Sequence, residues 1–351
     1  MRISRVLVVI IVVVVIGVIA LFVYSSLSTS GPPGTWTSGP GYPLQVSGTP
    51  GVVGQSCFNG TATIYCVGGI DYNGNSRNNV YSAAVSAAGM SGWTTDGNYP
   101  QTVGLQSCVS SGGFAYCIGG SYDDVGDDLA SSYYAPLTSS GIGSWNSTTS
   151  YPVAIDSQAC VASSGYIYCL GGENETSGTN STVIPTNSAW FASISSGGIG
   201  VWKHTTAYPS TVSFEACAAS KSDIYCVGGV DASNNGVASV YYAPISSSGI
   251  GQWSASTSYP FDAYGQTCVI DAGSLVCVGG VPNGTSSSSN GVYSAPVSSD
   301  GVGQWHKAGN YPVGIETACV ASSGNLYCSG GYQDSSTISG ATYYAKLQSL
   351  L

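Results

Sequence analysis

Charged side chains are scarce in this sequence. They make up 7% of its 351 residues, whereas ordinary soluble domains hold about 25%. Basic residues are the rarer kind, with 7 lysines and arginines against 17 acidic residues. Arg2 and Arg5 precede the first apolar run, so residues 25–351 hold 5 bases and 17 acids, a formal net charge of −12. A domain of this charge should repel nucleic acid, and no basic patch is present to bind one.

Histidine and arginine are too few for most catalytic sites. The two histidines, His204 and His306, each follow a tryptophan closely, in VWKH and QWH, which predicts positions on an outer strand. Arg77 is the only arginine after the apolar run, so no arginine cluster can bind a substrate carboxylate. We find no Ser-His-Asp set and no phosphate-binding loop. We therefore expect no enzyme activity and no cofactor. A carbohydrate-active enzyme is the least favoured alternative.

The N-terminal residues 1–24 differ in composition from the rest. Val6 to Tyr24 is an uncharged apolar run of 19 residues, which as a helix would extend about 28 Å and match a bilayer core. The arginines before it predict that the N-terminus stays in the cytoplasm and that the rest of the chain lies outside. A cleaved signal peptide is the alternative, although its apolar region is usually shorter. Residues 25–35 are rich in serine, glycine and proline, which predicts a flexible linker.

All twelve cysteines fall into six pairs, and each pair spans nine positions. The first members of successive pairs are separated by 51, 52, 57, 51 and 51 residues. A period near 50 with strand-forming composition indicates a β-propeller in which each repeat is one blade. The pairs are Cys57/Cys66, Cys108/Cys117, Cys160/Cys169, Cys217/Cys226, Cys268/Cys277 and Cys319/Cys328.

Each repeat carries further markers in a fixed order. A double glycine follows the cysteines, then come an aromatic strand such as YYAP, a tryptophan and a Tyr-Pro pair. The last repeat lacks its tryptophan and its Tyr-Pro, which occur instead at the start of the domain as Trp36 and Tyr42-Pro43. We therefore predict a closed ring over residues 36–351, in which the strand around Trp36 completes the last blade and no free sheet edge remains. The repeated tyrosines and tryptophans should then form the core between blades.

The double glycine, the tyrosine strand and the tryptophan resemble Kelch repeats, six in register. This resemblance implies an all-β, six-bladed propeller of four-stranded antiparallel blades, with strands A to D running outward from the axis. The cysteine pair would span strands A and B. The sequence departs from the family in its cysteines and in a longer tyrosine-to-tryptophan interval. We therefore do not transfer the function of cytoplasmic Kelch adaptors to this chain.

Each cysteine pair is expected to form a disulfide. A two-residue turn at Gly112-Gly113 would place Cys108 opposite Cys117, at a site without ladder hydrogen bonds where two cysteines can bridge. Zinc binding is the alternative, but it needs four ligands and each hairpin offers only two thiols. Six disulfides predict an oxidising location outside the cell. The same arithmetic places poorer turn residues at Thr61-Ala62 and Lys221-Ser222, so those loops should differ.

One end of the propeller is the predicted ligand face, because the B–C and D–A loops of a meander share an end. Carboxylates with aromatic side chains in these loops suit sugars, and clustered carboxylates also suit calcium. The alternative is a solvated acidic rim without a ligand. The candidates are Asp71, Tyr72, Tyr122, Asp156, Glu173, Phe214, Glu215, Asp231, Phe261, Asp262, Tyr264, Glu316 and Tyr332.

Two kinds of minor site complete the predictions. The loop SYDDVGDDLA offers Asp123, Asp124, Asp127 and Asp128 as calcium candidates, although it lacks an EF-hand pattern. N-x-S/T sequons are credible glycosylation sites in an exterior domain. They occur at Asn59, Asn146, Asn174, Asn180 and Asn283.

Together these features predict a membrane-anchored propeller outside the cell that binds a surface glycan or a surface protein. A structural envelope component without a discrete ligand is the alternative.

Overall fold

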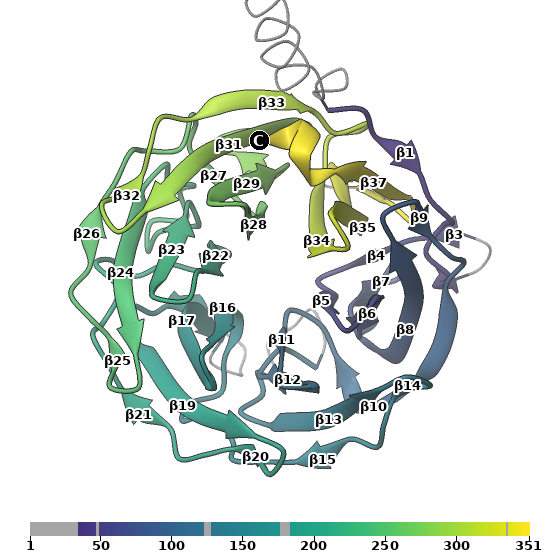
Figure 1. Ribbon diagram of the computed structural model, residues 1–351, viewed down its shortest axis with the longest axis horizontal. Coiled ribbons are helices and arrows are strands. Elements are labelled where there is room, and N and C mark those ends of the chain that lie inside the picture. The colour runs from purple at the N-terminus through teal and green to yellow at the C-terminus, as the bar shows by residue number, and fades with distance from the viewer. Residues whose placement is uncertain (1–33, 47–48, 123–127, 176–182, 335) are drawn as a thin grey trace, which may run out of the picture.

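Six four-stranded antiparallel blades surround a central axis in the computed structural model (Figure 1). The structure describes residues 34–46, 49–122, 128–175, 183–334 and 336–351. The prediction of an all-β, six-bladed propeller is thus confirmed. Within the described residues, no helix is long and apolar enough to cross a membrane. The predicted helix and most of the linker lie outside the described residues.

Each blade has an inner strand A, followed outward by strands B, C and D. Blade 1 consists of β5 (Ser56–Asn59), β6 (Thr63–Val67), β8 (Arg77–Ser86) and β10 (Thr94–Val103). Blade 2 consists of β11 (Ser107–Ser111), β12 (Phe114–Ile118), β13 (Ser132–Thr138) and β15 (Asn146–Ser147). Blade 3 consists of β16 (Asp156–Ser163), β17 (Tyr166–Glu175), β19 (Ala189–Ser195) and β21 (Lys203–His204).

The other three blades repeat this order. Blade 4 consists of β22 (Ala216–Ala219), β23 (Asp223–Val227), β24 (Val240–Ser246) and β26 (Ser254–Ala255). Blade 5 consists of β28 (Thr267–Asp271), β29 (Ser274–Val278), β31 (Gly291–Ser298) and β33 (His306–Asn310). Blade 6 consists of β34 (Glu316–Ser322), β35 (Asn325–Asp334), β37 (Thr342–Lys346) and β1 (Thr37–Ser38).

Short accessory strands occur beside the four main strands of the blades. Strand C of blades 1 to 5 turns back into a two-residue strand before the chain reaches strand D. These strands are β9 (Gly89–Met90), β14 (Gly141–Ile142), β20 (Gly198–Ile199), β25 (Gly249–Ile250) and β32 (Gly301–Val302). The remaining strands are β2 (Gln45–Val46), β3 (Thr49–Pro50), β4 (Val52–Val53), β7 (Ile70–Asp71), β18 (Val183–Pro185), β27 (Ala263–Tyr264), β30 (Val281–Pro282) and β36 (Thr337–Ile338). A 3₁₀ helix, Leu347–Leu350, follows β37.

The N-terminal strand closes the ring as predicted. In β1, Thr37 pairs with Tyr344 and Ser38 with Tyr343, so residues from both ends of the chain share blade 6 (Figure 1). The amide of Gly34 also donates to the carbonyl of Ser349 at 3.4 Å. The outer edge of blade 6 is therefore covered by the chain that begins the domain.

All six predicted disulfides are present. In each pair the two cysteines are directly opposed on strands A and B, with Cα atoms 4.1 Å apart. This distance is close to the roughly 4.5 Å of a pair without ladder hydrogen bonds. The bridges are Cys57–Cys66, Cys108–Cys117, Cys160–Cys169, Cys217–Cys226, Cys268–Cys277 and Cys319–Cys328.

The hairpin turns beside these bridges differ between blades, as expected. Gly112 and Gly113 both have positive φ, as a type I′ turn requires. Neither Lys221 nor Ser222 has a positive φ. The disulfide geometry is therefore kept while the turn that precedes strand B varies.

Aromatic rings form the packing between blades. The tyrosine of each Tyr-Pro pair meets the tryptophan of the next blade edge-to-face, with ring centroids 4.7 to 5.2 Å apart. This geometry directs the positive ring edge at the negative ring face. The six pairs are Trp36–Tyr311, Tyr42–Trp93, Tyr99–Trp145, Tyr151–Trp202, Tyr208–Trp253 and Tyr259–Trp305. The prediction that these residues are core is confirmed.

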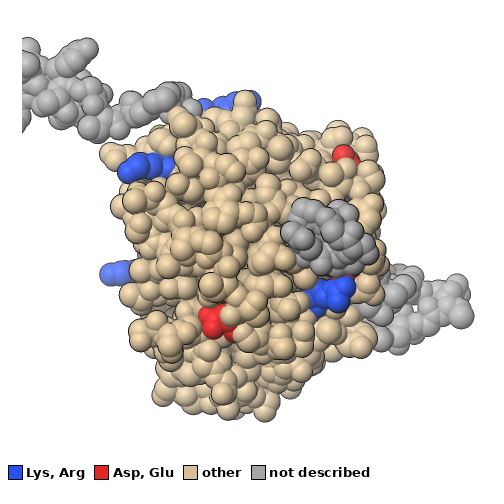
Figure 2. Space-filling model, turned by 90° about the vertical axis from the view of Figure 1, so that its right-hand side faces the viewer, with Lys and Arg blue, Asp and Glu red and all other residues tan. Residues whose placement is uncertain are grey.

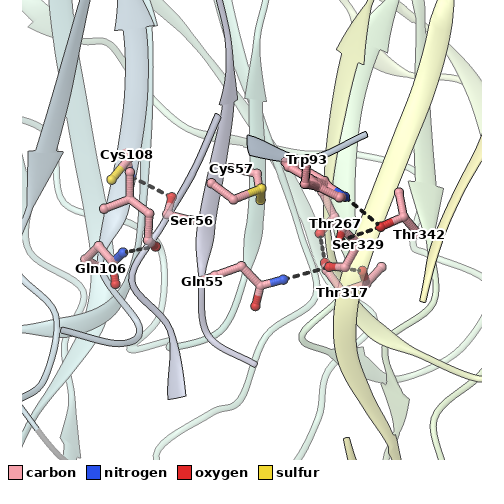
Figure 3. Close-up of a disulfide and its surroundings, with 12 residues drawn as sticks. Gln55, Ser56, Cys57, Trp93, Gln106, Cys108, Thr267, Thr317, Ser329 and Thr342 are labelled. Carbon is pink, nitrogen blue, oxygen red and sulfur yellow. Dashed lines mark hydrogen bonds between the residues drawn. A yellow bond between two sulfur atoms is a disulfide. The ribbon is translucent and has the colours of Figure 1, made fainter. Parts of the chain in front are cut away.

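A glutamine two positions before the first cysteine joins most neighbouring blades. Gln55 Nε2 donates to the carbonyl of Ser329 in blade 6 at 2.6 Å, and Cys108 N donates to Ser56 Oγ at 2.8 Å (Figure 3). Gln106, Gln158 and Gln266 make the same contact with the residue that follows the second cysteine of the preceding blade. We call these four residues the seam glutamines.

The double glycine lies at the same seam. Both glycines have positive φ in all six blades. A Cβ on Gly279 would overlap the carbonyl oxygen of Ile315, and the amide of Gly280 donates to that same oxygen at 2.9 Å. A side chain would therefore separate the blades. The double glycine ends strand B in blades 1, 2, 4 and 5, but β17 and β35 run on through it.

Candidate functional site

The B–C and D–A loops lie together around one opening of the central channel, as the strand order requires. The residue three positions before the first cysteine lines this opening in every blade. These residues are Gly54, Leu105, Ser157, Phe214, Gly265 and Glu316. The first five are linked from blade to blade by four backbone hydrogen bonds of 2.7 to 3.1 Å, each from the amide of one to the carbonyl of the one before.

The linked residues have an uncommon backbone conformation. Leu105, Ser157 and Phe214 have φ values of 59°, 52° and 54°, in the left-handed region that bulky residues avoid. Such strain costs about 1–3 kcal/mol per residue and is concentrated at functional sites in proteins. Leu105 and Phe214 both line a pocket beside the channel opening. The strained backbone therefore directs apolar side chains into that pocket.

Glu316 interrupts this pattern. It belongs to strand β34, where it pairs with Tyr332 of β35. In the described part of the chain, its amide does not continue the hydrogen-bond series that ends at Gly265. Its side chain lies against Gly265, where even a Cβ would collide with the Glu316 carboxyl. The opening is thus asymmetric, with a carboxyl group at the position that breaks the series.

A pocket of about 230 Å³ opens beside this carboxyl, and we call it the mouth pocket. Phe214 comes from the loop before blade 4, Tyr264 from β27 and Tyr332 from β35, so three blades contribute a ring. The lining residues are Val53, Gly54, Ile70, Leu105, Phe214, Tyr264, Glu316 and Tyr332. The structure thus brings together four residues that the sequence predicted separately: Phe214, Tyr264, Glu316 and Tyr332.

The Glu316 carboxyl lacks the hydrogen bonds that would stabilise its ionised form. Burial raises its pKa to about 7, and no described residue opposes that rise by hydrogen bonding or by positive charge. The nearby carboxyl also adds to the effect of burial in raising the pKa of Tyr264. A half-buried acid without a partner at the wall of an aromatic pocket is a functional-site signal.

A second pocket of about 420 Å³ adjoins the first. It shares Phe214 and Tyr264, whose ring centroids are 6.4 Å apart, with the mouth pocket. Glu173 and Asp231 line its far side, together with Asn234 and Asn283. The two pockets form one surface around the Phe214–Tyr264 pair, and we call the second one the side pocket.

The disulfides contribute to neither of these two pockets. The first cysteine of each pair lines the central channel, whereas the second is buried inside its blade with at most 1% of its surface exposed. The sequence predicted the pairing but not this difference in burial, which follows from the order of strands A and B. The second cysteines are therefore core residues that no ligand or metal can reach: Cys66, Cys117, Cys169, Cys226, Cys277 and Cys328.

Several predicted ligand residues instead hold the protein together. The side chain of Asp71 is fully buried, where it accepts a 2.6 Å hydrogen bond from Arg77 Nε and others from the amides of Asn73 and Asn75. These bonds and the guanidinium charge lower its pKa despite burial. Asp231 accepts the equivalent amide bonds from Ser233 and Asn235. These carboxylates shape their own loops.

Glu215 is also buried, with 7% of its surface exposed. It occupies the seam-glutamine position of blade 4, and its Oε1 lies against Gly171 as Gln266 Nε2 lies against Gly228. Burial and the nearby Glu173 raise its pKa well above the usual value. The sequence placed Glu215 on the ligand face, but this structure places it between blades 3 and 4. Alignment of the repeats at this position would have revealed the substitution.

Asp156 is buried at the start of strand β16. Burial, then the charges of Asp128 and Glu173, raise its pKa to about 8. Glu173 is its direct partner across β16 and β17. In the described residues, no three His, Cys, Asp or Glu side chains are grouped to hold a metal ion. The calcium candidates Asp123, Asp124 and Asp127 lie outside those residues.

The other predicted face residues are dispersed. Tyr72 and Tyr122 are 52% and 54% exposed in the B–C loops of blades 1 and 2, and Asp262 is exposed in the D–A loop before blade 5. Phe261 packs against Tyr259, with ring centroids 5.1 Å apart, so it belongs to the core between blades. His204 and His306 are exposed on the outer strands β21 and β33, as expected.

The sequons occupy different surroundings. Asn59, Asn146 and Asn283 are exposed. Asn174 is half-buried, and its Nδ2 donates to the carbonyl of Ala154 at 2.6 Å, so the nitrogen that would carry a glycan is engaged. Asn180 lies outside the described residues.

Charges are sparse on the surface in general. Figure 2 shows one side of the propeller with only isolated acidic and basic residues among uncharged ones. None of the five bases of the propeller lines either pocket: Arg77 binds Asp71, and Lys203 and Lys307 are on outer strands. The linings of the two pockets therefore supply no positive charge for an anion.

Comparison with known proteins identifies the fold. No protein-family model and no curated protein sequence matches the chain. The chain is similar to the solved structure of YjhT, with a TM-score of 0.69 over 86% of this chain and 95% of that one. The sequence identity is 14%, so the likeness concerns the six-bladed propeller fold and no function follows from it.

Proposed function

We propose that this chain is a membrane-anchored, Kelch-like binding module that holds a cell-surface glycan at its mouth pocket. The observation that carries this proposal is that Phe214, Tyr264 and Tyr332 line the same pocket as Glu316. Ligand sites in proteins are typically concave and largely apolar, with a few polar groups that fix orientation. Aromatic rings can cover the C–H face of a sugar, while a carboxyl binds its hydroxyl or amino groups.

The proposed location rests on separate features. Six disulfides suit an oxidising compartment, and the apolar run from Val6 to Tyr24 has the length of a membrane anchor. With the arginines before that run on the cytoplasmic side, the propeller would face the cell exterior. The exposed sequons Asn59, Asn146 and Asn283 fit the same location.

A surface protein is the second candidate ligand. Apolar side chains are exposed near the same face, with Tyr72 at 52%, Tyr122 at 54% and Ile184 at 51%. They are separated along the B–C loops rather than joined into one pocket. The mouth pocket therefore favours the glycan.

A glycan array tests the proposal with full-length protein purified in detergent. We expect Phe214→Ala to weaken binding by at least about tenfold, since an aromatic anchor of a ligand site is worth more than about 1.4 kcal/mol. Phe114→Ala is the matched control, because Phe114 lies at the A–B hairpin on the opposite end of blade 2. Binding that is lost equally in both variants, or that is absent from the unmodified protein, would contradict glycan binding. The second result would favour a structural envelope component.

A further inference from the structure

We propose that the mouth pocket recognises a protonated amino group, so that the glycan it prefers is an amino sugar. This inference rests on the proposed glycan binding and specifies the ligand's charge. Three features of the pocket carry it: the unpartnered Glu316 carboxyl, the aromatic rings that line the same pocket and the distribution of charge on the face.

The carboxyl is the first feature. Among the described residues no group hydrogen-bonds the Glu316 side chain, and burial alone determines its raised pKa. A buried carboxylate is costly unless a charge or a donor offsets its lost hydration. An ammonium group supplies both a positive charge and three N–H donors. An ammonium ligand would therefore give the Glu316 carboxylate the positive charge and the hydrogen-bond donors that the described protein groups do not provide.

The aromatic rings are the second feature. Phe214, Tyr264 and Tyr332 line the same pocket as the carboxyl. The face of an aromatic ring carries negative potential and attracts a cation within about 6 Å of its centre. A neutral sugar uses such rings only for apolar contact. A protonated amino sugar would use both the apolar faces and the ring potential.

The charge distribution is the third feature. The mouth pocket is lined by one acid and no base, and the adjoining side pocket is lined by Glu173 and Asp231 and again by no base. Residues 25–351 carry a formal net charge of −12. The field at this face therefore favours cations and disfavours the sulfated or carboxylated sugars of many surface glycans.

The size of the two pockets limits the ligand. Small-molecule pockets in proteins usually occupy about 300–1,000 Å³, so the 230 Å³ mouth pocket suits a small group such as a single sugar ring. The 420 Å³ side pocket lies across the Phe214–Tyr264 pair. A short oligosaccharide could then place one amino group near Glu316 and a second near Glu173.

The test compares two ligands that share the same sugar chain and differ in whether the amino groups are acetylated. Calorimetry at pH 7 and low salt measures binding of a β-1,4 glucosamine trimer and of the matching N-acetylglucosamine trimer to the full-length protein. Acetylation removes the positive charge and keeps the sugar rings. We expect the glucosamine trimer to bind at least about tenfold more tightly, as a charge-assisted contact predicts. Tighter or equal binding of the acetylated trimer would overturn the inference and support glycan binding.

Variants locate the effect. Glu316→Gln should remove the preference for the amino form, whereas Asp300→Asn, which removes an exposed carboxylate at the β31–β32 turn, should keep it. Phe214→Ala should weaken both trimers alike. If neither trimer nor any array glycan binds, both proposals fail. If the preference survives Glu316→Gln in a protein with an unchanged melting curve, the assignment to the mouth pocket is wrong.

Discussion

The indole of Trp36 meets the ring of Tyr311 edge-on, with centroids 4.7 Å apart and planes at 82°. Trp36 begins the propeller, whereas Tyr311 belongs to the loop that leads into blade 6, the last blade of the chain. The same contact recurs at the other five seams. The closure of the ring is thus made with the same aromatic pair as every internal seam.

Trp36→Ala tests whether closure contributes as much stability as an internal seam. Truncation of a core tryptophan costs about 3–5 kcal/mol, so Trp253→Ala, at a buried internal seam, should fall in this range. Trp36 is half-buried, and we expect a loss of about 2 kcal/mol or more in urea unfolding. A loss near zero for Trp36→Ala alone would mean that the terminal strand is only loosely attached.

Two glycine substitutions can distinguish the effect of close packing between blades from the strain of a positive φ. Gly279→Ala would press a methyl group onto the Ile315 carbonyl, whereas Gly284 has a similar φ of 74° and open space around it. We expect about 1–2 kcal/mol of destabilisation for Gly284→Ala and several kcal/mol for Gly279→Ala. Equal unfolding midpoints for the two variants would show that the seam tolerates separation.

Glu215 should make the protein more stable in acid than at neutral pH. Its folded pKa is raised, so the folded state holds the proton more tightly than the unfolded state. The contribution of Glu215 to the free energy of unfolding is therefore complete below about pH 4.5 and is lost as the pH rises through the folded pKa. Glu215→Gln should match the unmodified protein at pH 4 and exceed it by about 1–2 kcal/mol at pH 8, as measured by urea unfolding.

The reciprocal change serves as the control. Gln266→Glu places the same acid in the seam between blades 4 and 5, where Gln266 now donates to the carbonyl of Val227. An ionised carboxylate cannot donate that bond, so this variant should lose stability at pH 8 and little at pH 4. If both variants leave the pH profile unchanged, the seam does not depend on a proton at Glu215.

Removal of one disulfide should weaken the fold without abolishing it. Each bridge closes a loop of about ten residues, worth about 2.7 kcal/mol on the chain-entropy model. The double variant Cys108→Ser and Cys117→Ser should lose roughly this amount in chemical unfolding. An unfolding free energy equal to that of the unmodified, oxidised protein would show that this covalent linkage adds nothing.

The fold was predictable because the sequence repeats its physical constraints six times. A cysteine pair, a double glycine and a tryptophan at a period near 50 leave few architectures other than a propeller. The last repeat lacks its Trp and its Tyr-Pro, and their occurrence at the start of the domain correctly predicted which strand closes the ring. The accessory strands such as β25 were not predicted, because two residues are too few to carry an alternation pattern.

The site was predictable only in part, since a loop position does not determine where a carboxyl points. Glu316 and Phe214 were correctly placed at one opening by the strand order. The sequence also placed Asp71 there, but the structure shows its carboxylate already bound by Arg77 and by an amide of its own loop. Leu105 was missed, because nothing in the sequence near it marks the left-handed φ that turns its side chain into the pocket.

The two-residue pairing of β1 with β37 determines how the ring would carry a mechanical load. A pull through the residues before Gly34 enters the propeller at blade 6 and shears Thr37 and Ser38 against Tyr344 and Tyr343. Blade 6 also holds Glu316, where the backbone series around the opening stops. Tension at the N-terminus and a ligand at the mouth pocket would therefore act on the same blade.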